Sequence, residues 1–229
     1  MYITRLILAA TDKQTSSSLI ITHYYSHTHT PSLIHTHRKS IPIMAPITLY
    51  DITFGLHIKA FETFKVILLK AQAHSPSDAS SLPSARLYED MLPLSFQIQQ
   101  ASAIAKNTAA GLVPTCTVAR NEVWEDNEQT LEDLLVRVDK TLAMLKSINP
   151  EDVTEEIRDT IYERPVGGGP DAFKFRSDGS GMAMGLGLPS IIFHVTVAYC
   201  ILRNRGVPLG KSDFQTQFLM PHHMPKEEA

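Results

Sequence analysis

The chain has 229 residues, of which 43% are hydrophobic and 20% charged, with a formal net charge of -3. This balance is typical of one globular domain with an extension, and it argues against nucleic acid as a partner, because nucleic-acid binding draws on an excess of Lys and Arg. No apolar run approaches the roughly 20 residues of a membrane span, and Cys116 and Cys200 suit a reducing compartment, so we expect a cytoplasmic protein without a membrane partner.

Residues 1–43 are rich in Ser, Thr and His and show no helical or strand period. The alternation in Ser26-His-Thr-His-Thr30 is also what a CACACA nucleotide repeat encodes, and Met44 is a natural start. We therefore expect residues 1–43 to be a disordered leader or a gene-model extension. A mitochondrial presequence and weak divalent-metal binding by the histidines are the functional alternatives.

A first amphipathic helix is predicted from Thr48 to about His74. Thr48-Leu-Tyr-Asp51 has the pattern of an N-terminal capping box, and Ser75–Pro83 breaks the helix. His57 lies mid-helix without an obvious partner, so we expect it to be partly exposed. The apolar positions recur at spacings of three and four residues. They are Phe54, Ile58, Phe61, Phe64, Leu68 and Ala71.

A second helix is predicted to open near Asp90-Met-Leu-Pro93, with Asp90 as its cap and Pro93 in its first turn. A third helix is predicted to begin at Asp126 and to end at Asn149-Pro150. Each carries one apolar stripe. The stripes consist of Leu94, Ile98, Ala101, Ala105 and Leu112 in the second helix, and of Leu131, Leu134, Val138, Leu142 and Leu145 in the third.

A small β-hairpin is predicted next, because extended segments at 161–166 and 172–175 flank Gly167-Gly-Gly169. The fourth helix spans roughly Gly181 to Arg205, with a kink at Pro189 and a stop at Gly206. Residues 221–229 are expected to be a frayed tail. The predicted fold is all-α: an up-down four-helix bundle over residues 45–220, with a small hairpin between helices three and four.

His194 is the strongest candidate for a functional residue, because it lies on the apolar side of the fourth helix, where a titratable ring needs a hydrogen-bond partner or a metal. An antiparallel arrangement would bring His74, Asp90 and Gln97 toward the same end of the bundle. His194 is then a general base or metal ligand, with Gln97 or Asp90 fixing its ring, and His74 is a second candidate metal ligand. The structural alternative is a core histidine bonded to a neighbour.

Tyr199 is predicted to be a core residue with a bonded hydroxyl, and the alternative role is a proton donor near His194. For Asp90, the role of helix cap is favoured over a role in the site.

Several separated motifs carry a family resemblance: Arg86-Leu-Tyr-Glu-Asp-Met-Leu-Pro-Leu94 with Gln97, Phe193-His-Val-Thr-Val-Ala-Tyr199, and Gly206-Val-Pro-Leu-Gly-Lys-Ser-Asp-Phe214. Over residues 45–220 the chain resembles an uncharacterised bacterial and fungal family, known as a domain of unknown function and grouped with the DinB/YfiT-like superfamily. The resemblance implies a four-helix bundle.

The better-studied relatives in that superfamily bind a divalent metal through three histidines, one early in helix two and two as His-x-x-x-His in helix four. Here Gln97 stands at the first of these positions, and Ala198 stands four residues after His194. A divalent metal is thus the cofactor that the resemblance implies, but its ligand triad is incomplete.

Two functions follow as hypotheses. One is a small-molecule enzyme or binding domain with a polar pocket around His194. The other is a non-catalytic helical module for dimerisation or protein interaction, whose partner would be a second copy of the chain or another protein. A DNA-binding helix-turn-helix is disfavoured by the acidic body of the chain, which lacks a basic recognition helix.

Overall fold

The computed structural model describes residues 46–74, 80–167 and 172–219, and all of them lie in a compact unit that begins at Ala45. The expectations for residues 1–43 and for the tail at 221–229 fall outside the described residues. Four long helices form the bundle: α1 (Leu56–His74), α2 (Leu94–Leu112), α4 (Leu131–Lys146) and α7 (Leu188–Asn204). The fold is an all-α bundle with a small hairpin, as predicted.

The remaining elements are short. They are the π-helical segments η1 (Asp51–Gly55) and η4 (Met182–Gly187), the 3-10 turn η2 (Pro150–Asp152), the helices α3 (Thr117–Asn121), α5 (Glu155–Asp159), α6 (Gly179–Gly181) and α8 (Lys211–Leu219), and the strands β1 (Tyr162–Val166) and β2 (Phe173–Ser177). The helices α3, α5 and α8 were not predicted, because none of them carries a long apolar stripe.

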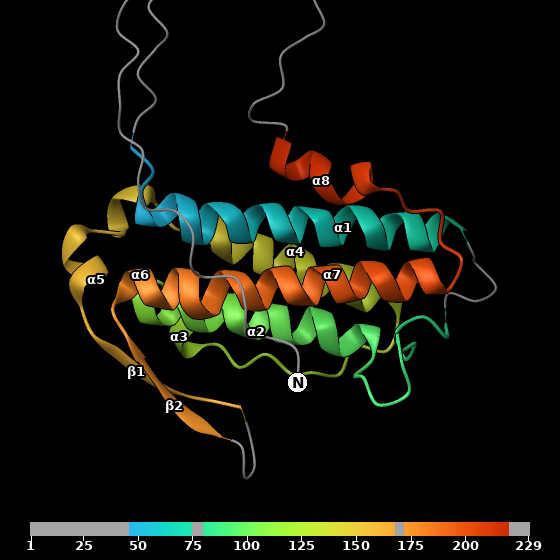
Figure 1. The fold of residues 1–229 in the computed structure, drawn as a ribbon, viewed down its shortest axis with the longest axis horizontal. Coiled ribbons are helices and arrows are strands. Elements are labelled where there is room, and N and C mark those ends of the chain that lie inside the picture. Colours follow the sequence, from blue (N-terminus) through green and yellow to red (C-terminus); the bar gives the residue numbers. More distant parts are fainter. Residues whose placement is uncertain (1–45, 75–79, 168–171, 220–229) are drawn as a thin grey trace, which may run out of the picture. The chain divides into compact units, whose positions relative to one another are not determined.

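The helix directions differ from a strictly alternating up-down order. Ion pairs Lys65–Asp139 and Glu62–Lys146 show that α4 runs antiparallel to α1. In Figure 1, α1 and α7 lie side by side and run in the same direction, and η1 contacts η4 at their beginnings. The order is therefore up-down-down-up. It requires a long connection between α2 and α4, which α3 and the extended segment 122–129 supply.

The helix starts confirm one predicted cap and correct two. The backbone N–H of Asp51 bonds to Oγ1 of Thr48 (3.1 Å), and the Asp51 carboxylate accepts from the Thr48 N–H (2.9 Å), as the capping box requires. Asp90 does not cap α2, because Pro93 occupies the N-cap position. Asp126 does not cap α4, because Thr130 does so, in a box with Asp133.

The core lies between the four long helices and includes the stripes that were predicted for three of them. Every residue of the α2 and α4 stripes is buried, and in α1 only Ile58 remains partly exposed. A fully buried side chain of this kind contributes about 1.5–3 kcal/mol of transfer free energy. The largest fully buried side chains are Phe54, Phe61, Phe64, Ile67, Leu68, Leu94, Ile98, Leu112, Leu134, Leu145, Ile191 and Ile201.

The fourth helical region runs without a break from Gly179 to Asn204. Pro189 lacks the N–H that an α-helix would bond to the Gly185 carbonyl, and the chain widens into η4 immediately before it. The predicted irregularity at Pro189 is therefore a π-helical segment. The helix ends as predicted at Gly206, whose φ of 87° places it in the left-handed region.

The sequence expectation that no run approaches the length of a membrane span is wrong for this region. Gly179–Asn204 is 26 residues long and contains an 18-residue window with a mean hydropathy of 1.8, so it meets the length and composition of a span. Core helices of bundles meet the same criterion. One face of this helix packs into the bundle, through residues that include Ile191, Val195 and Ile201.

The hairpin has the predicted position, with Tyr162 opposite Ser177 and Val166 opposite Phe173. Phe175 packs toward Gly185 of η4, which places the hairpin against the beginning of the fourth helical region. At the other end of that region, α8 folds back onto α1. Oγ1 of Thr63 donates to the Phe214 carbonyl (3.1 Å).

Candidate functional site

His194 and Gln97 form the polar contact at the centre of the candidate site. Nδ1 of His194 lies 2.9 Å from Oε1 of Gln97. The two residues come from the middle of α7 and the first turns of α2, which run antiparallel to one another. The structure thus brings together these two predicted site residues, although 97 positions separate them in the chain.

The orientation of the Gln97 amide fixes the tautomer of His194. Nε2 of Gln97 donates to the carbonyls of Leu92 (3.0 Å) and Pro93 (3.4 Å), so its Oε1 faces the histidine as an acceptor. Nδ1 of His194 must therefore carry the hydrogen, and Nε2 carries the lone pair. Gln97 is buried, and the two carbonyls that it bonds belong to the turn before α2. Both the packing and these backbone bonds therefore fix the position of the Gln97 amide.

The His194 ring is half-buried between two aromatic rings. Phe96 and Phe193 meet it edge to face, with centroid distances of 6.4 Å and 5.4 Å. Burial disfavours the charged imidazolium and lowers the pKa of His194 to about 4. The ring is thus neutral near pH 7 and offers Nε2 as a hydrogen-bond acceptor beside an apolar flank.

The other predicted site residues do not join this pair. His74 is exposed at the last residue of α1, and Asp90 is exposed in the turn before α2. Tyr199 turns toward α8: its hydroxyl donates to the Leu209 carbonyl (3.5 Å), and its ring packs edge to face on Phe214. The structural role predicted for Tyr199 agrees with these contacts.

The expectation that His57 would be partly exposed is wrong. It is completely buried, and neither ring nitrogen has a hydrogen-bond partner within the described part of the chain. Burial lowers its pKa to about 3. The sequence pattern missed it because His57 stands between Phe54 and Phe61 on the inward side of α1, where spacing alone does not separate a buried polar residue from an exposed one.

The donor set does not fit the divalent metal that the superfamily implies. Among the described residues, no group of three or more His, Cys, Asp or Glu side chains could hold a metal ion. The Oε1 of Gln97 faces His194 rather than a common centre, and Ala198, one turn further along α7, has no ligating atom. We therefore derive no chemistry through a metal.

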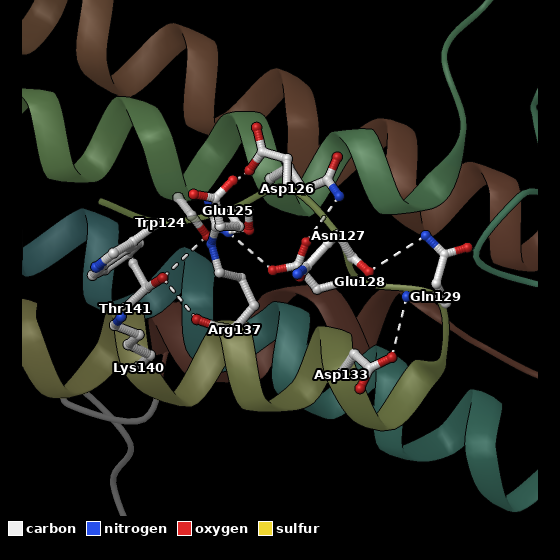
Figure 2. A network of polar contacts seen from close by, with 12 residues as sticks. Trp124, Glu125, Asp126, Asn127, Glu128, Gln129, Asp133, Arg137, Lys140 and Thr141 are labelled. Carbon is white, nitrogen blue, oxygen red and sulfur yellow. Dashed lines mark hydrogen bonds and ion pairs between the residues drawn. The ribbon is translucent and has the colours of Figure 1, made fainter. Parts of the chain in front are cut away.

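A second polar cluster lies where the segment 122–129 crosses the bundle (Figure 2). A cavity of about 430 Å³ is lined there by residues that include Trp124, Arg137 and Lys140. In Figure 2, Arg137 extends from α4 toward the segment, where its guanidinium binds the Glu125 carbonyl, the Asp126 carboxylate and the Glu128 carboxylate at 2.9–3.0 Å.

The charges in this cluster are largely paired with one another. Lys140 lies 4.7 Å from the centroid of the Trp124 ring and also pairs with Glu122 (3.0 Å). Glu128 accepts from Gln99 of α2 as well as from Arg137. These bonds fasten the crossing segment to α2 and α4, so we assign the cluster a role in positioning the chain. The sequence carried no signal for the buried Arg137, whose partners precede it by 9–12 residues across a loop.

Comparisons with known proteins agree with this geometry. Residues 49–215 match the family described as a domain of unknown function, DUF1993. No curated protein matches the chain. Among solved structures, the crystal structure of a DinB family member protein from Shewanella denitrificans is similar, with 27% sequence identity and a TM-score of 0.62, over 79% of this chain and 95% of that one.

The matched segment covers well over half of the chain and includes all four long helices. The resemblance drawn from the sequence motifs is therefore confirmed. The chain belongs to the DUF1993 family, a domain of unknown function, and it has a DinB-like helical bundle.

Proposed function

We propose that this domain binds a small molecule at Nε2 of His194. The observation that supports the proposal is the fixed tautomer: Gln97 holds the Nδ1–H and leaves Nε2 as an acceptor on a neutral ring. A histidine with a purely structural role would need only the bond from its Nδ1–H to Gln97. Phe96 and Phe193 flank the ring, so the ligand class is a molecule with an apolar body and a hydroxyl or amine donor.

Binding fits the ring better than proton abstraction does. A general base works best when its pKa lies near the working pH, whereas burial holds the pKa of His194 at about 4. Gln97 offers a neutral oxygen rather than a carboxylate, so it does little to stabilise a positively charged imidazolium. Recognition of a hydrogen-bond donor is therefore the main role, and catalysis would require a ligand that raises this pKa.

The test follows the ring nitrogens of His194 by ¹⁵N nuclear magnetic resonance while phenol and benzyl alcohol are added as probes. We expect the Nε2 shift to move on titration in the native protein. Gln97→Leu should weaken that response, because without the Gln97 oxygen the hydrogen of His194 is no longer held on Nδ1. His74→Gln is the matched control, since His74 is an exposed histidine outside the pair. An Nε2 that carries the hydrogen in the native protein would refute the proposal.

Metal content is measured in parallel on protein purified without an affinity tag. We expect no stoichiometric metal in the native protein. A bound metal that is lost in His194→Ala would show that His194 is a ligand, and the proposal of a metal-free binding site would then fail.

One observation favours a second candidate, dimerisation through the outer face of α7 and η4. Phe193 and Met184 expose 56% and 51% of their surface, and residues 182–202 contain no Asp, Glu, Lys or Arg. A second copy of the chain could cover this face without placing like charges opposite one another. Sedimentation of the native protein and of Phe193→Ser tests it: a native dimer that dissociates in the variant supports this role, and a native monomer rules it out.

A further inference from the structure

One arginine lies on the face of the hairpin that is turned away from solvent. Alternate residues of β1 are half-buried, and these are Tyr162, Arg164 and Val166. Phe175 pairs with Arg164 across the hairpin and is also half-buried, so it lies on the same face. Within the two strands, Arg164 is thus the charged side chain on a face of aromatic and aliphatic ones.

Arg164 lines a cavity of about 330 Å³ to which the hairpin, α2 and η4 contribute. A space of this size suits a small ligand. Tyr162, Pro165 and Met182 give the cavity apolar surface, and Asn107 of α2 adds an exposed amide that can donate hydrogen bonds.

The guanidinium of Arg164 has no hydrogen-bond or ion-pair partner within the described part of the chain. The carboxylate that lines the same cavity, Glu163, pairs instead with Arg176 (3.0 Å). Burial lowers the pKa of Arg164, but an arginine side chain stays charged in a protein. A partly buried charge without a counter-ion is costly, and an anion bound beside it would reduce that cost.

Gly111 leaves the α2 side of the cavity free of a side chain. It lies near the end of α2, although glycine forms helices less well than alanine does. A Cβ at Gly111 would meet nothing within 4 Å, so no neighbouring atom requires a glycine here. The missing side chain instead adds room to the cavity that Gly111 lines.

We propose that Arg164 binds the carboxylate of a small organic acid in this cavity. The planar guanidinium matches the two oxygens of a carboxylate, and the apolar surface accommodates the body of the acid. One guanidinium balances the single charge of a carboxylate, whereas a phosphate would bring a second charge close to Glu163. The cavity therefore favours a carboxylate over a phosphate.

This site is separate from the one proposed at His194. Gln97 contacts His194 from the first turns of α2, whereas Asn107 lies in its second half. The helix rises about 15 Å between Gln97 and Asn107, at roughly 1.5 Å per residue. The two sites also differ in chemistry, because His194 offers an acceptor and Arg164 offers charged donors.

The experiment titrates the full chain at low salt with benzoate and, separately, with its neutral counterpart benzamide. Nuclear magnetic resonance follows the Arg164 Nε–H signal, which Arg164→Met assigns by its disappearance. We expect a saturable shift with benzoate and none with benzamide. Calorimetry should show benzoate binding weakened by about tenfold or more in Arg164→Met, because hydrogen bonds to charged groups are among the stronger ones. Lys174→Met is the matched control with native affinity, since it removes an exposed cation from the same hairpin.

A second variant tests the cavity without changing its charge. Gly111→Leu places a side chain in the open space beside Arg164 and suits a helix, so it should fold and lose benzoate binding. Inorganic phosphate is the competing probe. Native protein that does not bind benzoate, native affinity in Gly111→Leu, or tighter binding of phosphate than of benzoate would each overturn the proposal.

Discussion

Nη1 of Arg137 lies 2.9 Å from Oε1 of Glu128, and the two side chains expose only 5% and 9% of their surface. This buried pair joins α4 to the segment that crosses the bundle from α3. The crossing is what allows α2 and α4 to run in the same direction, so the contact supports the topology as well as the local packing.

Arg137→Ala should destabilise the domain by about 3–5 kcal/mol, because it leaves the Glu128 carboxylate buried without its main partner. The matched control is Lys65→Ala, which removes an exposed ion pair with Asp139 and should cost less than about 1 kcal/mol. Urea unfolding of the two variants measures the difference. Equal costs would mean that Glu128 finds other partners when Arg137 is removed.

Leu134→Ala should lower the free energy of unfolding by about 2–5 kcal/mol, through lost burial and an unfilled cavity. Leu134 is completely buried in α4, and Leu142→Ala should behave similarly. Val136→Ala on the exposed side of the same helix is the control, with an expected change within about 0.5 kcal/mol. A loss below about 1 kcal/mol at both leucines would contradict the assigned core.

Acidification should destabilise the domain through its two buried histidines. Burial lowers the pKa of His57 to about 3 and that of His194 to about 4, from an ordinary value of 6.5. As pH falls below 6.5, the unfolded chain takes up protons that the folded protein does not. The free energy of unfolding therefore falls, by about 1.4 kcal/mol per pH unit for the fully buried His57, until the folded ring also titrates.

Urea midpoints between pH 7 and pH 4.5 test this dependence, with His57→Leu as the variant and His74→Gln as the control. His57→Leu should have a clearly shallower pH dependence than the native protein, and His74→Gln should not. Carboxylates with a lowered pKa, such as Asp133 and Asp213, add acid sensitivity of their own, but they do so equally in all three proteins. Parallel curves for His57→Leu and the native protein would show that His57 is not held neutral.

Removal of residues 1–43 should leave the stability of the domain unchanged. The capping box of Thr48 and Asp51 satisfies the backbone at the start of the first helix without any contribution from residues 1–43. The family match begins at residue 49. Differential scanning calorimetry of the full chain and of a chain beginning at Met44 measures the effect. A transition several degrees lower in the shorter chain would show that the leader packs on the domain.

The sequence by itself determined the four long helices and the core between them, because both depend on local spacing. Periodic apolar residues such as Leu134 and Leu142 identify a buried face wherever the helix lies in the bundle. The sequence also drew attention to His194, with Gln97 or Asp90 as its partner, but it left the choice between those two open. The predicted N-caps of α2 and α4 were wrong. Several residues before each helix could serve as a cap, and the path of the preceding loop decides which one does.

Only the tertiary structure decided which way α4 runs and which polar groups are buried. The direction depends on the path of residues 122–129, which is set by contacts between distant residues such as Arg137 and Asp126 rather than by local preference. The burial of His57 likewise depends on its neighbours in α2 and η4. The tautomer of His194 follows from carbonyls that bind the far end of Gln97, a relationship that exists only once the helices are packed.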